Sequence, residues 1–246
     1  MAHRGASVEQ PENTIEAFEA AIDAGADAVE LDVRMTADGV AVVMHDADVS
    51  RTTDGTGLVP ELTLSDARRL RIPLPGGGAA GVPILQDALE CLAGRAAADI
   101  EIKNLSGEPG FTPDREDAVD ATLEALDATG FTDPVIVSSF NPRSIAHSLR
   151  LRPEVPTGLL TSYDVDADEA LAQATEGGHP WVLPFVSKVL EAGDGFADRV
   201  HAGGALLGVW IADDPTMART LFEWGVDAVA TNDPRAIVAV RDEVAG

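Results

Sequence analysis

Residues 28–33 read Ala-Val-Glu-Leu-Asp-Val, an alternation of apolar and polar side chains that is typical of a β-strand. Alternation places Glu30 and Asp32 on one face of this strand and the apolar residues on the other. Six similar runs follow, at 98–103, 134–140, 157–161, 181–185, 206–212 and 228–231. Amphipathic helical patterns separate most of them, at 115–128, 142–151, 167–176, 196–202, 215–224 and 234–244.

Repeated alternation of strands and helices indicates a parallel sheet. The runs make seven strands, and an eighth is expected at the start of the chain, ending at His3. Eight strand-helix units in 246 residues have the size of a TIM barrel, so we expect an α/β fold with a (β/α)8 barrel in one domain, residues 1–246. The turn-rich segment at about 47–82 breaks the alternation and is predicted to be a small insertion after the second strand and its hairpin.

The helix expected between the first two strands has recognisable ends. Asn13 is predicted to be its N-cap, because Glu16 three residues on completes the spacing of a capping box. Gly25 occupies the position at which a glycine commonly ends a helix.

The composition excludes several classes of protein. With 45% hydrophobic and 24% charged residues the chain is expected to fold, and its one cysteine excludes an internal disulfide. The net charge of −25 disfavours a nucleic-acid partner, and no apolar run is long enough for a membrane span. We therefore expect a cytoplasmic protein with a small-molecule partner; the sequence predicts no oligomeric state.

The basic residues are unevenly divided between lysine and arginine. Only two basic residues are lysines, Lys103 and Lys188, and the rest are arginines. High acidity with few lysines favours a protein that works in concentrated salt, where screening weakens self-repulsion. Codon bias toward alanine, glycine, arginine and aspartate is the alternative explanation.

The two acidic residues of the 28–33 strand need a compensating charge. Two like charges about 4 Å apart repel by roughly 4 kcal/mol at an effective dielectric constant of 20. Asp38-Gly39 predicts a two-residue hairpin, which places position 45 opposite position 32. His45 is therefore expected beside Asp32, on the face that carries Glu30.

Two further segments add chemistry to this face. In residues 99–103 the same alternation puts Glu101 with Glu30 and Asp32 around one cation, and Lys103 nearer the end of the strand where TIM barrels keep their active sites. His3 and Arg4 follow the expected first strand. The carboxylates would hold Mg²⁺ or Ca²⁺, the two basic side chains would neutralise a phosphate, and the histidines suit general acid and base roles.

These residues and several others make the chain resemble the glycerophosphodiester phosphodiesterase family. The residues that carry the resemblance are His3-Arg4-Gly5, Pro11-Glu12-Asn13-Thr14, Glu30-Leu31-Asp32-Val33, Asp38-Gly39, His45-Asp46, Arg51-Thr52-Thr53, Glu101-Ile102-Lys103 and Trp210. The resemblance implies a TIM barrel that hydrolyses glycerophosphodiesters to an alcohol and sn-glycerol 3-phosphate. It also implies catalytic His3 and His45, metal ligands Glu30, Asp32 and Glu101, and substrate contacts from Arg4, Lys103 and Trp210.

The chain departs from the family pattern at two places. Only Met1 and Ala2 precede the His-Arg-Gly motif, where relatives carry several apolar residues, so the first strand is expected to be trimmed or very short. The usual Trp-Thr-Val-Asn stretch ends in Asp213 here, which is expected to add negative charge near the site.

Three alternatives stay open. The first is a lysophospholipase D-type enzyme that acts on a larger lipid phosphodiester. The second is a non-catalytic binding barrel, which predicts a missing acid, base or ligand, and none is missing. The third assigns Glu30, Asp32 and Glu101 to a buried salt-bridge network with Arg4 and Lys103 instead of a metal.

Overall fold

The computed structural model describes residues 1–246 and contains a main sheet of nine strands. Eight of them are parallel and follow the order β1-β2-β6-β7-β8-β9-β10-β11. Their bounds are β1 Ala2–His3, β2 Ala28–Met35, β6 Ala97–Ile102, β7 Val135–Ser139, β8 Thr157–Leu160, β9 Trp181–Leu183, β10 Leu206–Val209 and β11 Ala228–Val229. The ninth strand, β3 (Ala41–Val43), pairs antiparallel with β2.

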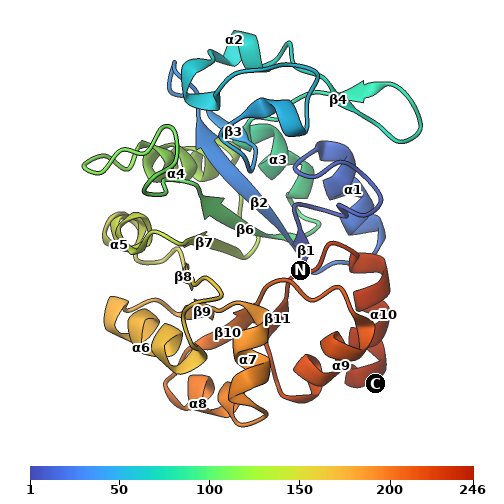
Figure 1. Ribbon diagram of the computed structural model, residues 1–246, viewed down its shortest axis with the longest axis vertical. Coiled ribbons are helices and arrows are strands. Elements are labelled where there is room, and N and C mark those ends of the chain that lie inside the picture. The colour runs from blue at the N-terminus through green and yellow to red at the C-terminus, as the bar shows by residue number, and fades with distance from the viewer.

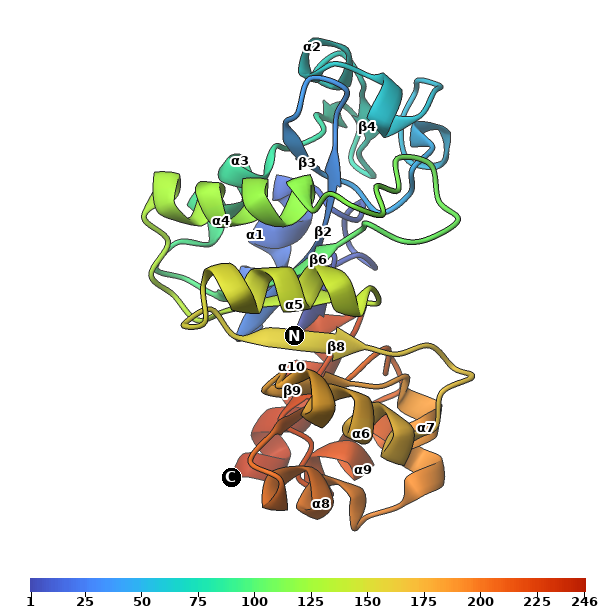
Figure 2. The same cartoon turned by 90° about the vertical axis from the view of Figure 1, so that its left-hand side faces the viewer.

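Helices connect these strands and cover the outside of the sheet (Figure 1). Their bounds are α1 Ile15–Asp23, α2 Leu64–Ala67, α3 Leu85–Leu92, α4 Asp117–Thr129, α5 Pro142–Leu151, α6 Ala167–Gly177, α7 Val186–Ala192, α8 Phe196–Ala202, α9 Pro215–Glu223 and α10 Pro234–Ala245. Figure 2 shows α4 and α5 lying side by side along the outer face. None of the helices combines the length and apolarity that crossing a membrane requires.

The barrel closes where the first and last strands meet. Ala2 pairs with Val29 of β2 on one side and bridges to Thr231, just beyond β11, on the other. Two backbone hydrogen bonds hold this closure, from His3 N to Thr231 O (2.8 Å) and from Thr231 N to Met1 O (3.1 Å). The expected (β/α)8 barrel is thus confirmed, and the first strand is as short as the sequence predicts.

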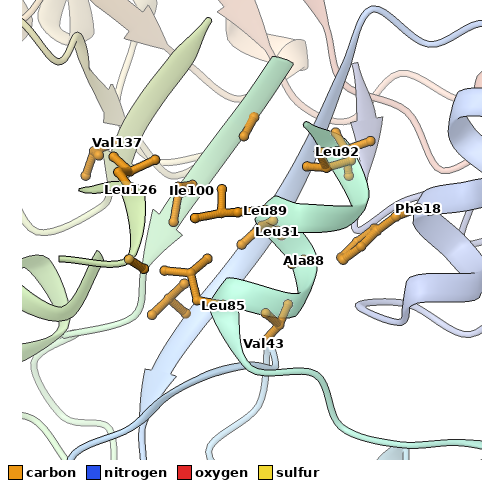
Figure 3. Packing of buried hydrophobic residues seen from close by; sticks show 14 of the residues in the cluster. Phe18, Leu31, Val43, Leu85, Ala88, Leu89, Leu92, Ile100, Leu126 and Val137 are labelled. Atoms are coloured by element: carbon orange, nitrogen blue, oxygen red, sulfur yellow. The ribbon is translucent and has the colours of Figure 1, made fainter. Parts of the chain in front are cut away.

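The alternation along the strands separates the apolar core from the polar interior of the barrel. Leu31 of β2 and Ile100 of β6 point outward and pack beneath α3, against Leu85 and Leu89 (Figure 3). All four side chains are fully buried, and burial of such a side chain stabilises the fold by about 1.5–3 kcal/mol. Because neighbouring residues point the opposite way, Glu30, Asp32, Asp99 and Glu101 face the inside of the barrel.

The segment predicted to be an insertion lies between β3 and α3, at the top of Figure 1. It holds α2, two short 3₁₀ turns at Val49–Arg51 and Val59–Glu61, and a small hairpin of β4 (Ile72–Pro73) and β5 (Ala79–Ala80). A separate apolar cluster packs it together, built from Val42, Met44, Val49, Val59, Ala67, Ile72, Ala80 and Val82. The division into one domain with an insertion stays a prediction.

The N-cap of α1 differs from the prediction by one residue. The hydroxyl of Thr14 accepts the hydrogen bond from Ala17 N, whereas Asn13 has a φ of 58°. An N-cap residue takes extended backbone, as Thr14 does, and the left-handed backbone of Asn13 excludes that role. Gly25, with a φ of +82°, follows the C-cap of the helix as predicted.

Candidate active site

A cavity of about 350 Å³ lies among the inner faces of the strands and the residues that directly follow them. Seven of the predicted site residues line it: His3, Arg4, Glu30, His45, Glu101, Lys103 and Trp210. The eighth, Asp32, has no exposed surface and pairs with Arg4 and Lys103. The fold therefore brings all the predicted site residues together, at the end of the barrel where this architecture keeps its sites.

The register of the sheet determines the relative positions of the three carboxylates. In the parallel pair β2–β6, Glu30 lies beside Asp99 and Asp32 beside Glu101. One carboxylate oxygen from each of Glu30, Asp32 and Glu101 lies within 4.8 Å of the other two, and all three residues are buried. The alternation of 28–33 and 99–103 thus produces the acidic cluster that the sequence predicts.

Two cations compensate this negative charge. Lys103 Nζ lies 3.2 Å from Asp32 Oδ1 and 2.8 Å from Glu101 Oε1, and Arg4 Nε lies 3.3 Å from Asp32 Oδ2. Burial disfavours ionisation of Asp32, but Lys103 and Arg4 outweigh it and hold its pKa below the usual range. The ion pairs of the salt-bridge alternative are therefore present.

The other two acids of the cluster, Glu30 and Glu101, have raised pKa values. Burial, with the charges of Asp32 and Glu101, raises the pKa of Glu30 well above its usual value. Burial also raises the pKa of Glu101 to about 7, against the opposing effect of Lys103. The two cations thus stabilise the charged form of Asp32, whereas Glu30 and Glu101 hold a proton to higher pH than ordinary carboxyl groups.

The donor set fits a divalent cation. Glu30 Oε2 accepts a hydrogen bond from Arg4 N (2.9 Å), whereas Glu30 Oε1 is buried and has no hydrogen-bond partner. Buried polar atoms without partners are rare, and clustered carboxylate oxygens are the ligands that Mg²⁺ and Ca²⁺ prefer. Glu30, Asp32 and Glu101 could therefore hold an ion.

His3 lies against the carboxylate cluster. Its Nδ1 is 2.8 Å from Asn232 Oδ1, and its Nε2 is 3.9 Å from Glu30 Oε2. Burial and the neighbouring charge of Arg4 lower the pKa of His3 to about 4. At neutral pH the ring is therefore uncharged, with one nitrogen able to accept a proton.

The hairpin that carries His45 has a register one residue away from the predicted one. Val33 pairs with Val43, so Asp32 lies opposite Met44, and the predicted direct opposition of Asp32 and His45 is wrong. The loop has three residues rather than two: Thr36 N donates to Val40 O (3.0 Å). Gly39 supplies the left-handed position, φ +79°, that such a three-residue loop requires.

His45 still reaches the cavity, because it lies beyond the end of β3. Its Nδ1 is 2.6 Å from Asp46 Oδ1, and burial lowers its pKa. Arg34 Nε donates to the carbonyl oxygen of His45 (2.6 Å), and the Arg34 guanidinium also pairs with Glu108, which lines the cavity. Sequence analysis missed Arg34, although it shares a strand face with Glu30 and Asp32.

Aromatic side chains form the opposite, apolar side of the cavity. The Trp210 ring meets Phe140 edge to face at 5.2 Å between centroids and Phe185 at 5.0 Å. Trp210 Nε1 donates to Leu183 O (3.0 Å), which fixes the indole. Such edge-to-face pairs are worth about 0.5–1.5 kcal/mol each and help to hold the Trp210 ring, which lines the cavity, in place.

Asn13 is a second site residue that sequence analysis missed. Its Nδ2 donates to Asp32 Oδ2 (2.7 Å), and its Oδ1 accepts from Asp32 N (3.3 Å). The left-handed backbone that excludes Asn13 as the N-cap turns its amide toward β2. Asparagine tolerates this conformation better than most residues, which is the signal that the sequence carried.

Comparisons with known proteins agree with the geometry. The model of the Glycerophosphoryl diester phosphodiesterase family matches residues 3–236. A glycerophosphodiester phosphodiesterase of Caldanaerobacter subterraneus subsp. tengcongensis is 31% identical over 247 residues, which cover 97% of this chain and 95% of that relative.

Solved structures show the same fold. A glycerophosphodiester phosphodiesterase of Agrobacterium tumefaciens has a TM-score of 0.81 at 26% identity, covering 97% of each chain. A phosphodiesterase of Oleispira antarctica, in complex with the product sn-glycerol-3-phosphate, has a TM-score of 0.84 at 24% identity, covering 98% of this chain and 95% of that one. With the family match over nearly its whole length, this chain belongs to the glycerophosphoryl diester phosphodiesterase family and is a phosphoric diester hydrolase.

Proposed function

We propose that the protein hydrolyses glycerophosphodiesters to an alcohol and sn-glycerol 3-phosphate. One observation carries this proposal: a cluster of three buried carboxylates lies beside a single cavity that two cationic side chains and two imidazoles line. The fold is shared with a phosphodiesterase whose structure contains the product sn-glycerol-3-phosphate, which supports a small-molecule substrate.

The residues of the cavity take distinct roles in this proposal. Arg4 and Lys103 neutralise the phosphate. Both side chains now face carboxylates, and the negative charge of the phosphate takes the place of part of that carboxylate charge. His3 and His45 exchange protons with the attacking oxygen and the leaving alcohol, each worth about 10²–10⁴ in rate. Trp210 contacts the substrate on the apolar side of the cavity.

Glu30, Asp32 and Glu101 are proposed to hold one divalent cation, Mg²⁺ or Ca²⁺. When bound, the ion neutralises phosphate oxygens and lowers the pKa of a hydroxyl group that contacts it. The Glu30 Oε1 atom, which has neither a hydrogen-bond nor an ion-pair partner, supports this assignment over a pure salt-bridge network.

The direct test is an assay that couples release of glycerol 3-phosphate from glycerophosphocholine to a dehydrogenase, with and without EDTA. We expect release that stops with EDTA and returns with Mg²⁺ or Ca²⁺. Absence of glycerol 3-phosphate with every divalent cation tried would remove the proposed activity.

A lysophospholipase D-type activity is the second candidate, and the aromatic wall of the cavity favours it. Phe140 and Trp210 line the cavity and offer apolar surface that an acyl chain would cover. Parallel assays with glycerophosphocholine and lysophosphatidylcholine separate the candidates, and we expect turnover of the first to dominate.

The cytoplasmic location expected from the sequence also stays a prediction.

Replacing Lys103 by Met distinguishes a substrate-binding role from a purely structural one. The substitution keeps the length of the side chain and removes its charge, so we expect a higher KM and a lower kcat, because the phosphate loses a cation. Steady-state kinetics with a thermal melt as companion measure both effects. A variant with unchanged kinetics and a lower melting temperature would favour the salt-bridge network.

We also propose that the fold is adapted to salt. The surplus of 42 acidic over 17 basic residues opposes compaction, and the Debye length falls from about 10 Å at 0.1 M to about 3 Å at 1 M salt. The melting temperature is expected to rise by many degrees between about 0.1 M and 2 M KCl. A polyol series is the control for general solute exclusion, and a flat KCl series would leave codon bias as the explanation.

A further inference from the structure

Asp213, at which the Trp210 stretch departs from the family pattern, does not line the cavity. Its carboxylate accepts three hydrogen bonds: from Thr231 Oγ1 (2.8 Å), from Asn232 N (2.7 Å) and from Asn232 Nδ2 (2.7 Å). Asp213 follows β10 and Asn232 follows β11, so these contacts lie beside the closure of the barrel at β1. Asn232 in turn contacts His3: its Oδ1 lies 2.8 Å from His3 Nδ1.

The carboxylate determines which way the amide of Asn232 points. Its hydrogen bonds with Asn232 and Thr231 outweigh burial and lower the pKa of Asp213, so it is ionised at neutral pH. An ionised carboxylate only accepts hydrogen bonds, so the NH₂ group of Asn232 must face it. The carbonyl oxygen of the same amide then faces His3 and the Ser7 hydroxyl, 3.0 Å away.

The orientation of the amide in turn determines the tautomer of His3. An amide oxygen cannot donate, so His3 Nδ1 must carry the hydrogen in this contact. A neutral imidazole has only one N–H, which leaves Nε2 bare. Nε2 is the nitrogen on the side of Glu30, which lines the cavity.

We propose that Asp213 is a positioning residue that, through Asn232, holds His3 in the tautomer whose Nε2 accepts a proton in the cavity. The inference deepens the proposed function and rests on it for the catalytic consequence. The hydrogen-bond chain itself is independent of that function. The added negative charge of Asp213 therefore acts through two protein contacts and not on the substrate.

The tautomer can be measured directly in the resting protein. In long-range ¹H–¹⁵N spectra of the ¹⁵N-labelled protein at neutral pH, His3 is expected to show a protonated Nδ1 and a bare Nε2. The His3→Gln variant assigns its signals among the five histidines. A wild-type His3 that is protonated at Nε2, or that averages both tautomers, would overturn the proposal.

Two single variants and their combination test the chain. In Asp213→Asn the new NH₂ group meets that of Asn232, so the Asn232 amide flips and presents its NH₂ to His3. We expect the Nε2–H tautomer to appear and kcat to fall at least tenfold, toward the full value of about 10²–10⁴ for a general base, with KM changed much less. Asn232→Asp places two carboxylates together, but the new carboxylate can still accept from His3 Nδ1, so this variant is expected to keep the Nδ1–H tautomer and to lower the melting temperature.

The double variant Asp213→Asn with Asn232→Asp reverses the donor and the acceptor and keeps every contact. The amide introduced at position 213 would donate to the carboxylate introduced at position 232, and that carboxylate would again accept from His3 Nδ1. We expect the Nδ1–H tautomer to return and most of the lost kcat to be recovered, which independent effects cannot produce. Losses that multiply in the double variant would refute the chain.

A matched control lies one residue further on. Asp214 caps α9 by accepting from Met217 N (2.9 Å), and Asp214→Asn keeps an N-capping side chain without touching His3. It is expected to leave both the tautomer and kcat unchanged, and a loss as large as that of Asp213→Asn would show a general effect of the loop. A wild-type protein with the expected tautomer but no phosphodiesterase activity would refute the proposed function and not the hydrogen-bond chain.

Discussion

Replacing either His3 or His45 by Ala is expected to lower kcat for a glycerophosphodiester by about 10²–10⁴-fold, because each removes a general acid or base from the cavity. Coupled release of glycerol 3-phosphate measures the loss. Both variants should fold, since His45 is only partly buried and His3→Ala removes the ring contact with Asn232 but keeps the backbone hydrogen bonds with Thr231 and Ser7. A thermal melt of each variant checks this.

The remaining histidines of the chain serve as matched controls. His147 and His201 pair with acidic residues at the surface, at 2.8 Å from Asp120 and 2.7 Å from Asp227, and His179 contacts Thr157. None of the three lines the cavity, so their Ala variants should keep kcat within about threefold of the wild type. A His45→Ala enzyme with a similarly small loss would remove His45 from the mechanism.

Removal of divalent cations is expected to abolish activity altogether. Arg4 and Lys103 are paired with Asp32 and Glu101 in the metal-free cavity, so without the ion the phosphate would lack the additional positive charge that the ion supplies. Dialysis against EDTA followed by the coupled assay measures the effect, and titration of Mg²⁺ or Ca²⁺ measures recovery. Full activity in protein shown by elemental analysis to be free of metal would contradict the assignment.

The same cluster predicts how cation binding depends on pH. Burial raises the pKa of Glu101 to about 7 in the metal-free protein, so the ion must displace a proton below that pH. Because the pKa of Glu30 is also raised, a second proton must leave, and affinity should increase as pH rises through 7. Calorimetric titration of Mg²⁺ between pH 6 and pH 8 measures this, with Glu101→Gln as the variant that lacks the Glu101 charge and its share of the pH dependence.

Three features of the protein could be predicted from its sequence with no knowledge of distant contacts. Alternation in residues 28–33 and 99–103 assigns Glu30, Asp32 and Glu101 to one face, because successive side chains of any strand point to opposite sides. Repetition of strand and helix predicts the barrel, since parallel neighbours need a helical crossover. The spaced motifs identify the family, and the family model matches the same span.

The sequence-based predictions of local geometry were wrong at two places. A three-residue loop with Gly39 in the left-handed region and a two-residue loop can both contain Asp-Gly, and the choice shifts the hairpin register by one residue. Asn13 suits an N-cap and a left-handed backbone equally well by residue type. Its contact with Asp32 selects the second, and only the packing of the α1 entry segment against β2 supplies that contact.

The sequence by itself determined the barrel, the face on which the acids lie and the residue types of the site. The tertiary structure alone decided which partner orients each of them. His3 and Asn232 are 229 positions apart and meet only because β1 closes against the segment that follows β11. Periodicity depends on the backbone of a few neighbours, whereas hydrogen bonds across the closure depend on the tilt and register of the whole sheet.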